Sequence, residues 1–227
     1  MKLLAIETST EACSAALYLD NEIHESFELA PREHTKRILP MIDKLMAEAQ
    51  LTPHQLDGIA FSCGPGSFTG VRIATGITHG IALGADLPVV PVSTLAAIAQ
   101  TFFNQNPETL AFTAMDARMS EIFWGVYQKD HEGYAQLINK EAVTPATDIK
   151  FPIESGVGIG TGFSLYHTEL NHALGELLQR YETDNLPRAS AIAQLGALGL
   201  KNNQGVSVEL AQPTYLRDKV AKKESER

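Results

Sequence analysis

The residues best suited to chemistry lie in two short turns, each of which follows an apolar stretch. In the first turn, Glu7 ends the stretch LLAIE and is followed by Thr8, Ser9 and Thr10. Hydroxyl and backbone N–H groups can bind a phosphate, and the acid could hold the water shell of a metal ion. The turn has no glycine, which close approach of phosphate to a backbone favours. Two interpretations stay open: a degenerate nucleotide-binding turn, or a connection whose hydroxyls bond the local backbone.

The second turn contains Asp116 after the stretch LAFTAM and looks like a remodelled phosphate site. Ala117 and Arg118 stand where a phosphate-binding turn needs small, flexible residues. We expect Arg118 to pair with Asp116 or Glu121. Further on, GVGIGTGF (residues 156–163) has alternating glycines but not the GxGxxG spacing, so it is either a remnant of an adenosine pocket or an irregular edge strand.

The stretch FSCGPGSFTGVRIATG (residues 61–76) excludes two common motifs. It has no G-x-x-x-x-G-K-[ST], so it is not a P-loop. It is not a hydrolase elbow either, because Pro65 and Thr69 replace the glycines around Ser67. We predict a sharp turn at residues 64–66 and a helix from about Ser67 to Gly84, with Ser67 as its N-cap.

Neither a metal site nor a catalytic group is predicted, and neither is a cofactor of the chain's own. No two histidines have a ligand spacing such as HxxxH or HExxH, and His167 and His172 are five residues apart. Cys13 and Cys63 lack CxxC spacing and are expected to be buried free thiols in a reducing cytoplasm.

Composition and charge narrow the class of partner. The chain has 227 residues, a net charge of −9 and 44% hydrophobic residues. No lysine occurs between Lys44 and Lys129, so the basic stripe of an autonomous RNA- or DNA-binding protein is missing. The C-terminal RDKVAKKESER is expected to be a solvated end. The apolar runs are too short to span a bilayer, and the N-terminus is not typical of a secretory signal. We therefore expect a cytoplasmic protein without membrane or DNA contact.

The order of predicted elements indicates an internal repeat. We predict five strands in the first half: KLLAIET, CSAALYLD, EIHESFEL, LDGIAFSCG and LPVVPVS. We predict helices over TKRILPMIDKLMAEAQ, from Thr52, from about Ser67 and over TLAAIAQTFF. The second half restarts this pattern: at a constant offset, Leu3 falls on Phe112, Glu7 on Asp116 and Tyr18 on Tyr127.

Such a repeat is typical of the α/β fold of actin, Hsp70 and the sugar kinases. In that fold two βββαβα lobes face each other across a cleft, and here the second lobe is shortened and degenerate. We place the N-terminal lobe with its interface helices at residues 1–104. The degenerate C-terminal lobe with its charged tail then covers residues 105–227.

Glycines recur along one face of the helix that begins near Ser67. Gly76, Gly80 and Gly84 lie at i, i+4 and i+8. Each interior glycine costs about 1 kcal/mol relative to alanine, so the row costs about 3 kcal/mol unless Gly84 is the C-terminal cap. A bare face lets another helix approach closely and recover that loss. The neighbour is either the chain's own helix at residues 35–50 or a helix of another subunit.

Several stretches together resemble the bacterial TsaB (YeaZ) family. They are LAIETSTEACSAALY, GPGSFTGVRIATGITHGIA, VSTLAAIA, DARMSEIFWGVY and PTYLRDKVA, and the resemblance extends from the N-terminus to about Ala221. It implies the actin-like fold with a degenerate second lobe. It also implies a non-catalytic role in making threonylcarbamoyladenosine beside the anticodon of tRNAs that read codons beginning with A.

The resemblance also implies partners. Proteins of this family bind and organise the catalytic paralogue TsaD together with the ATPase TsaE, reach tRNA only through the complex, and dimerise through first-lobe helices when alone. A nucleotide at the partner interface is a further expectation. The residues that we assign to the partner surface are Ile38, Ile42, Leu45, Arg72, Gly76 and Gly80. The alternative is a free-standing weak ATPase or peptidase, for which the sequence offers no nucleophile, base or metal.

Overall fold

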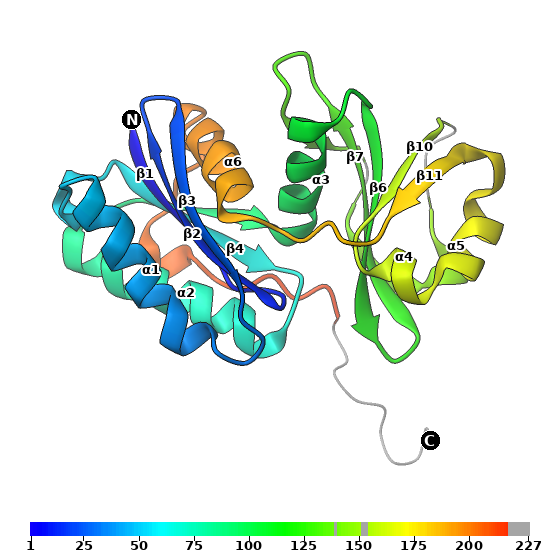
Figure 1. Ribbon diagram of the computed structural model, residues 1–227, viewed down its shortest axis with the longest axis horizontal. Coiled ribbons are helices and arrows are strands. Elements are labelled where there is room, and N and C mark those ends of the chain that lie inside the picture. The colour runs from blue at the N-terminus through cyan, green and yellow to red at the C-terminus, as the bar shows by residue number, and fades with distance from the viewer. Residues whose placement is uncertain (139, 151–153, 218–227) are drawn as a thin grey trace.

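Two mixed β-sheets, each flanked by helices, stand side by side (Figure 1). The computed structural model describes residues 1–138, 140–150 and 154–217. The strand order of the first sheet is β3-β2-β1-β4-β5, in which β1 to β3 are antiparallel and β1, β4 and β5 are parallel. Its strands are β1 (Lys2–Glu7), β2 (Ala12–Leu19), β3 (Glu22–Leu29), β4 (Gly58–Gly64) and β5 (Val89–Ser93).

The second sheet repeats the order of the first. Its path β8-β7-β6-β10-β11 corresponds strand by strand to β3-β2-β1-β4-β5, and an extra strand, β9, also pairs with β7. Its strands are β6 (Leu110–Arg118), β7 (Glu121–Lys129), β8 (Ala135–Leu137), β9 (Ala142–Pro145), β10 (Gly156–Ile159) and β11 (Leu178–Glu182). The predicted internal repeat and the two-lobed α/β fold are therefore confirmed.

The constant offset predicted between the two halves holds for β2 and β7 but is wrong by one residue for β1 and β6. Leu3 pairs with Tyr18 in the first sheet, whereas Phe112 pairs with Val126 in the second. Leu3 and Tyr18 share one core cluster, but Phe112 and Tyr127 lie in different clusters. Because side chains alternate along a strand, a shift of one residue moves a residue to the other face of its sheet.

Two helices cover the outer face of the first sheet, α1 (His34–Glu48) and α2 (Phe68–Ala85) (Figure 1). Ser67 caps α2 as predicted, because its Oγ accepts a hydrogen bond from the N–H of Gly70 at 3.3 Å. The C-cap is Asp86 in the left-handed conformation, so Gly84 lies inside the helix and is not its cap. The helix predicted from Thr52 is a single turn, η1 (Pro53–Gln55), whose capping residue Thr52 donates its N–H to Gln55 Oε1 at 2.8 Å.

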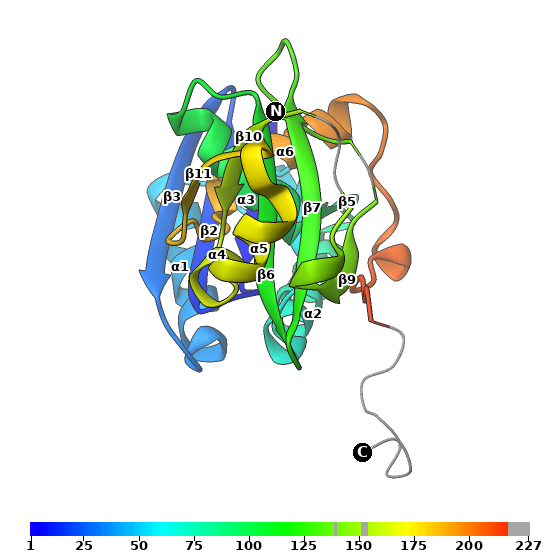
Figure 2. The same ribbon diagram turned by 90° about the vertical axis from the view of Figure 1, so that its right-hand side faces the viewer.

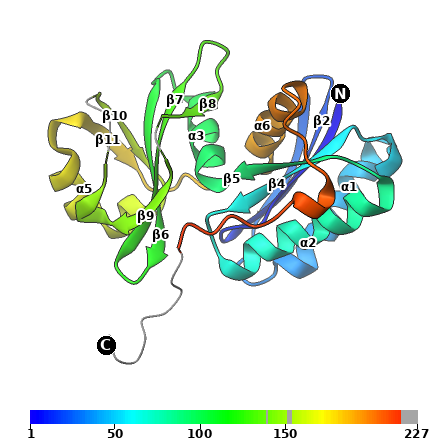
Figure 3. The same cartoon turned by 180° about the vertical axis from the view of Figure 1, so that it is seen from behind.

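The middle layer between the sheets holds α3 (Thr94–Gln105) and α6 (Ala189–Lys201) (Figures 1 and 3). The small residues of α6 pack with Leu3 and Ala60 of the first sheet. The apolar side of α3 packs with Val157 and Ile159 of the second sheet. The boundary after residue 104 stays a prediction. The helix before it, α3, packs mainly on the second sheet, and the helix after it in this layer, α6, packs on the first.

The chain returns to the first lobe after α6. Val206 forms an antiparallel bridge with Val89, and Ala211, just after η4 (Val208–Leu210), lies in the core beneath α1 and α2. Figure 3 shows this segment beside α2 and β4. The predicted charged tail starts at Arg217, and its other residues lie outside the described part of the chain.

Short helices complete the second lobe. On its outer face, α4 (Gly162–Leu165) and α5 (His167–Leu174) pack against Phe112 and Trp124 of the second sheet (Figure 2). The other single turns are η2 (Ala146–Asp148) and η3 (Gly175–Leu177). Within the described ranges, none of the helices combines the length and the apolar character that crossing a bilayer needs.

The contrast between two helical glycines tests the placement of α6. A Cβ on Gly196 of α6 would lie 2.3 Å from Ala60 Cβ, whereas a Cβ on Gly80 of α2 would meet no described atom within 4 Å. We expect Gly196→Ala to lower the free energy of unfolding by about 1–3 kcal/mol through overpacking. We expect Gly80→Ala to raise it by up to about 1 kcal/mol. Urea unfolding measures both, and a Gly196→Ala protein as stable as the unmodified chain would contradict the packing described.

Candidate functional site

A cleft of about 960 Å³ opens between the two lobes. Its first-lobe wall includes the turn after β1 (residues 9–11), the segment before α1 with its first residues, and the start of α2 (residues 65–71). Its second-lobe wall includes residues 115–118 of the turn after β6, and residues 214–217 border it as well. The structure thus brings both predicted acidic turns to one cavity, although Glu7 itself does not line it.

Glu7 is a buried structural carboxyl. Its Oε1 accepts hydrogen bonds from Ser9 N at 2.5 Å and from Ser9 Oγ at 2.6 Å, and its Oε2 is buried without a partner among the described residues. Burial raises the pKa of Glu7 from 4.5 to about 7, against the opposing hydrogen bonds from Ser9. A carboxyl that is half protonated at neutral pH and withdrawn from the cleft is poorly suited to hold the water shell of a metal ion.

The turn after β1 is fastened directly to the start of α2. Ser67 donates its N–H to Ser9 O at 2.7 Å, and Thr8 Oγ1 donates to Gly70 O at 2.7 Å. A Cβ on Gly70 would lie 2.1 Å from Thr8 O, and one on Gly66 would lie 2.5 Å from Ser9 O. The glycines of GPGSFTG therefore allow two backbone segments to touch, and no phosphate is needed to explain them.

The hydrogen bonds within this turn and from it to α2 use most of the polar groups of the first turn that were predicted to bind a nucleotide. Thr8 and Ser9 are fully buried, and Ser9 Oγ also accepts a hydrogen bond from Thr94 Oγ1 at 3.1 Å. Ser9 and Thr10 line the cleft, and Thr10 is only half-buried. Nucleotide binding at Glu7, Thr8, Ser9, Thr10 and Asp116 stays a prediction.

The second turn has a different geometry. Asp116 Oδ1 accepts hydrogen bonds from Arg118 N at 2.9 Å and from Tyr166 Oη at 3.1 Å, and its Oδ2 lies 3.2 Å from Arg118 Nη1. Arg118 thus pairs with Asp116, one of the two acids proposed, whereas Glu121 binds Arg217. Both oxygens of Asp116 thus have partners, two of them supplied by Arg118 of its own turn.

The two acids do not occupy equivalent positions. Glu7 pairs with Ser14 in the first ladder. When β2 is superimposed on β7, Ser14 corresponds to Phe123, and Phe123 pairs with Met115. Met115 therefore stands where Glu7 does, and Asp116 is one residue beyond it, beside an irregularity in the ladder.

The alternating glycines of GVGIG belong to an interior strand, because β10 lies between β6 and β11. The edge-strand interpretation is therefore wrong. A Cβ on Gly158 would lie 2.4 Å from the ring of Phe163, and one on Gly162 would lie 2.7 Å from Ala114 Cβ. These glycines make room for neighbouring side chains in the core of the second lobe.

The glycine row of α2 faces outward. Arg72, Gly76, Gly80 and Gly84 are exposed along one line, and Cβ atoms on the three glycines would meet no described atom within 4 Å. The interpretation that the helix at residues 35–50 packs on this row is therefore wrong. Leu83, next to the row, is 71% exposed. We call this line of four residues the glycine face.

Three residues assigned to the partner surface lie inside the protein. Ile38, Ile42 and Leu45 are at most 6% exposed and pack in the core between α1 and the first sheet. Their helical spacing marks the buried face of α1, and the assignment to a surface is corrected. The outward side of α1 carries Leu39, which is 52% exposed.

Sequence reasoning missed an aromatic stack at the start of the glycine face. The guanidinium carbon of Arg72 lies 3.3 Å from the ring centroid of Phe68 and 5.1 Å from that of Tyr215, and its Nη1 donates to Phe68 O at 3.0 Å. Phe68 and Tyr215 are both more than half exposed. The i, i+4 spacing of Phe68 and Arg72 could have indicated half of the stack. Tyr215 joins it from the far end of the chain.

Comparison with known proteins identifies the family. Residues 18–225 match the family model described as TsaD, tRNA N6-adenosine threonylcarbamoyltransferase. The chain is 40% identical to the tRNA threonylcarbamoyladenosine biosynthesis protein TsaB of Escherichia coli K12, over 97% of this chain and 96% of that protein. The chain belongs to the TsaB family. Its similarity to the TsaB of Haemophilus influenzae is 38% identity over 97% of this chain and 95% of that protein.

Solved structures agree with the TsaB assignment. The structure of YeaZ from Pseudomonas aeruginosa superposes with a TM-score of 0.87 at 36% identity, covering 95% of this chain and 99% of that one. A second structure, described as an uncharacterized protein with similarity to peptidase YeaZ from the same organism, gives 0.89 at 37% identity with the same coverage. These matches confirm the two-lobed α/β fold that was predicted from the sequence.

The buried carboxyl of Glu7 should make the free energy of unfolding depend on pH. Its pKa is higher in the folded protein than in the unfolded chain, so the folded state binds more protons between pH 4.5 and about 7. Its contribution to stability is thus greatest at low pH and falls as the pH rises through that window. We expect Glu7→Gln, which keeps an acceptor for Ser9, to be more stable than the unmodified chain at pH 8 by up to about 3 kcal/mol.

Urea unfolding of both proteins at several pH values measures this difference. The advantage of the Gln variant should shrink below pH 5, where Glu7 is protonated in both states. A difference that stays constant from pH 5 to pH 8 would contradict the burial of an ionisable Glu7.

Proposed function

We propose that this chain is a non-catalytic subunit in the biosynthesis of threonylcarbamoyladenosine in tRNA. In this proposal it binds and organises the catalytic paralogue TsaD together with the ATPase TsaE. The observation that carries it is the open glycine face of α2, on a chain whose relatives are named for this biosynthesis. Because the complex modifies tRNA, the proposal places the chain in the cytoplasm.

The glycine face supports a helix of another subunit as the partner. Three interior glycines cost α2 about 3 kcal/mol, and no described residue recovers this by packing on them. A helix from outside could do so, because bare glycines let two helix backbones approach closely. The α2 sequence has no acidic residue and only one arginine, so little charge must be desolvated at such a contact. When the chain is alone, a second copy is proposed to occupy the same face.

The chemistry of the described residues supports a role without catalysis. Burial raises the pKa of both thiols, Cys13 and Cys63, to about 11, so neither is a thiolate nucleophile at neutral pH. The His34 ring nitrogen Nε2 lies 3.1 Å from the backbone oxygen of Ala12, so this nitrogen already has a hydrogen-bond partner. The described ranges hold no group of three or more histidine, cysteine or acidic residues that could bind a metal ion.

Charge supports indirect contact with tRNA. With a net charge of −9, the chain has little to attract a phosphate backbone by itself. We propose that tRNA is reached only through the complex. The chain is proposed to have no cofactor of its own, and a nucleotide at the partner interface remains part of the proposal.

Substitutions on the glycine face test the partner assignment. We expect Gly76→Leu combined with Gly80→Leu to abolish co-purification with TsaD, because the leucines would fill the space that a partner helix needs. The free energy of unfolding of the monomer should not fall, since both positions are open in it. The matched control is Thr168→Leu on the exposed side of α5, which should co-purify normally. Retention of TsaD by the double variant would contradict the proposal.

The inter-lobe cleft favours the second candidate, a free-standing ATPase or peptidase. Titration calorimetry of the isolated chain with Mg-ATP, together with a peptide-cleavage assay, separates the two functions. We expect no turnover in either assay, because Asp116 is paired with Arg118 and both thiols are protonated. Measurable hydrolysis by the isolated chain would favour the second candidate.

A further inference from the structure

Residues 211–217 connect the two lobes along one side of the cleft, and we call them the strap. The strap begins in the first lobe, where Ala211 is buried in the core and its carbonyl oxygen lies 2.6 Å from His79 Nε2 of α2. Thr214 donates its N–H to Cys63 O at 2.7 Å, at the end of β4. A Cβ on Gly64 would lie 2.8 Å from Thr214 O, so the strap is seated directly on the backbone of the first lobe.

The middle of the strap lies against the glycine face. The ring of Tyr215 packs on Phe68 at 6.4 Å between centroids and on the guanidinium of Arg72. Between the strap and α2 lies a groove of about 420 Å³, whose lining includes Gly76, Gln212 and Tyr215. The strap is therefore one wall of the surface that α2 presents.

The end of the strap binds the second lobe. The Nη2 of Arg217 forms an ion pair with Glu121 Oε2 and lies 3.4 Å from Arg118 O, and its Nη1 lies 3.5 Å from Met119 Sδ. The side chains of Arg217 and Glu121 are 20% and 32% exposed, so this pair is screened by water less than a fully exposed pair. All three contacts lie where β6 turns into β7.

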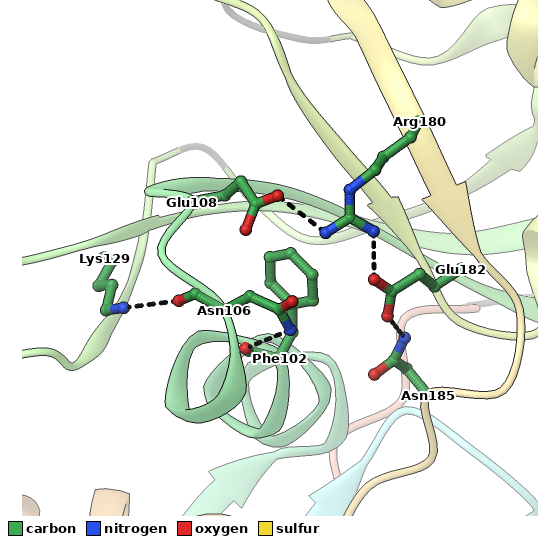
Figure 4. Close-up of polar contacts among 7 residues, drawn as sticks. All are labelled: Phe102, Asn106, Glu108, Lys129, Arg180, Glu182 and Asn185. Carbon is green, nitrogen blue, oxygen red and sulfur yellow. Dashed lines mark hydrogen bonds and ion pairs between the residues drawn. The ribbon is translucent and has the colours of Figure 1, made fainter.

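Two connections of the chain, the one before β6 (residues 106–109) and the one after β11 (residues 183–188), are joined by polar contacts in the second lobe. Arg180 of β11 binds Glu108 of one connection at 2.8 Å and also Glu182, which accepts from Asn185 of the other connection at 2.8 Å (Figure 4). Lys129 Nζ donates to Asn106 O at 3.0 Å beside them. These contacts tie the two connections to β11 in the second lobe, and the strap is a separate contact between the lobes.

We propose that the strap is a latch that couples the arrangement of the lobes to the glycine face. Only one residue separates Tyr215 from Arg217, a span of about 7 Å at most. If the second lobe moves away while Arg217 stays paired, Tyr215 is drawn from Phe68 and Arg72, and the groove beside Gly76 changes. Docking on α2 and the spacing of the lobes are then linked and reciprocal. The latch stands on these contacts alone, whereas its effect on a partner rests on the proposed function.

Charge reversal across the latch tests it in the full-length chain without TsaD, with labelled chains diluted into unlabelled ones so that only distances within one chain are measured. Spin labels at His54→Cys in the first lobe and Thr168→Cys in the second, both exposed positions, report the inter-lobe distance by double electron–electron resonance. We expect Arg217→Glu and Glu121→Arg each to broaden or lengthen the distance distribution. The double variant, Arg217→Glu with Glu121→Arg, should restore it, because the pair forms again in the opposite sense. Arg37→Gln, which removes a pair with Glu33 inside the first lobe, is the matched control and should change nothing.

Affinity for TsaD is the second readout. We expect each single reversal to weaken binding at least five-fold and the double variant to recover it. Distances that are unchanged by both single reversals would overturn the latch. Altered distances with unaltered TsaD affinity would overturn the coupling and leave the latch supported. If the unmodified chain fails to bind TsaD, the proposed function fails, and the distance measurement still decides the latch.

Discussion

The contact between the turn after β1 and the first turn of α2 determines the rest of the site. Two backbone segments touch there, with Ser67 N–H bonded to Ser9 O and two glycines free of any Cβ that would separate them. This contact places the N-terminus of α2 at the cleft and directs the helix across the outer face of the sheet. The turn thus uses the Oγ1 of Thr8 and the N–H of Ser9 in bonds with α2 and with Glu7.

The same contact supports the proposal that this lobe serves partner recognition. One end of α2 is fixed by the fastening, and the helix then exposes glycines where a covered helix would have larger residues. At its first turns the glycine face meets Tyr215 of the strap, which continues to Glu121 in the second lobe. The surface that we propose for a partner is thus built from the first lobe and the strap, and Arg217 joins it to the second lobe.

Local patterns predicted what depends on local physics. The strands, the Ser67 cap and the repeat of strand order follow from alternation, capping chemistry and strand-sized apolar runs. Helical spacing found Ile38, Ile42 and Leu45 but could not say that their face is the buried one, because periodicity marks an apolar side and not its neighbour. The one-residue shift at Asp116 and the arrival of Tyr215 at Arg72 depend on pairing between distant segments, which spacing in a single sequence does not contain.

The exchange of α3 and α6 between the halves has a consequence for synthesis. The second sheet and the helix that covers its inner face come from one continuous stretch, residues 94–182. The core of the first sheet, by contrast, is complete only after α6 and Ala211 have been synthesised. A ribosome releases the N-terminus first, yet the lobe that begins there is the last to have all its parts. Its apolar inner face stays uncovered until nearly the whole chain has emerged. A nascent chain of this protein is therefore most exposed to aggregation late in translation, and through its earliest strands.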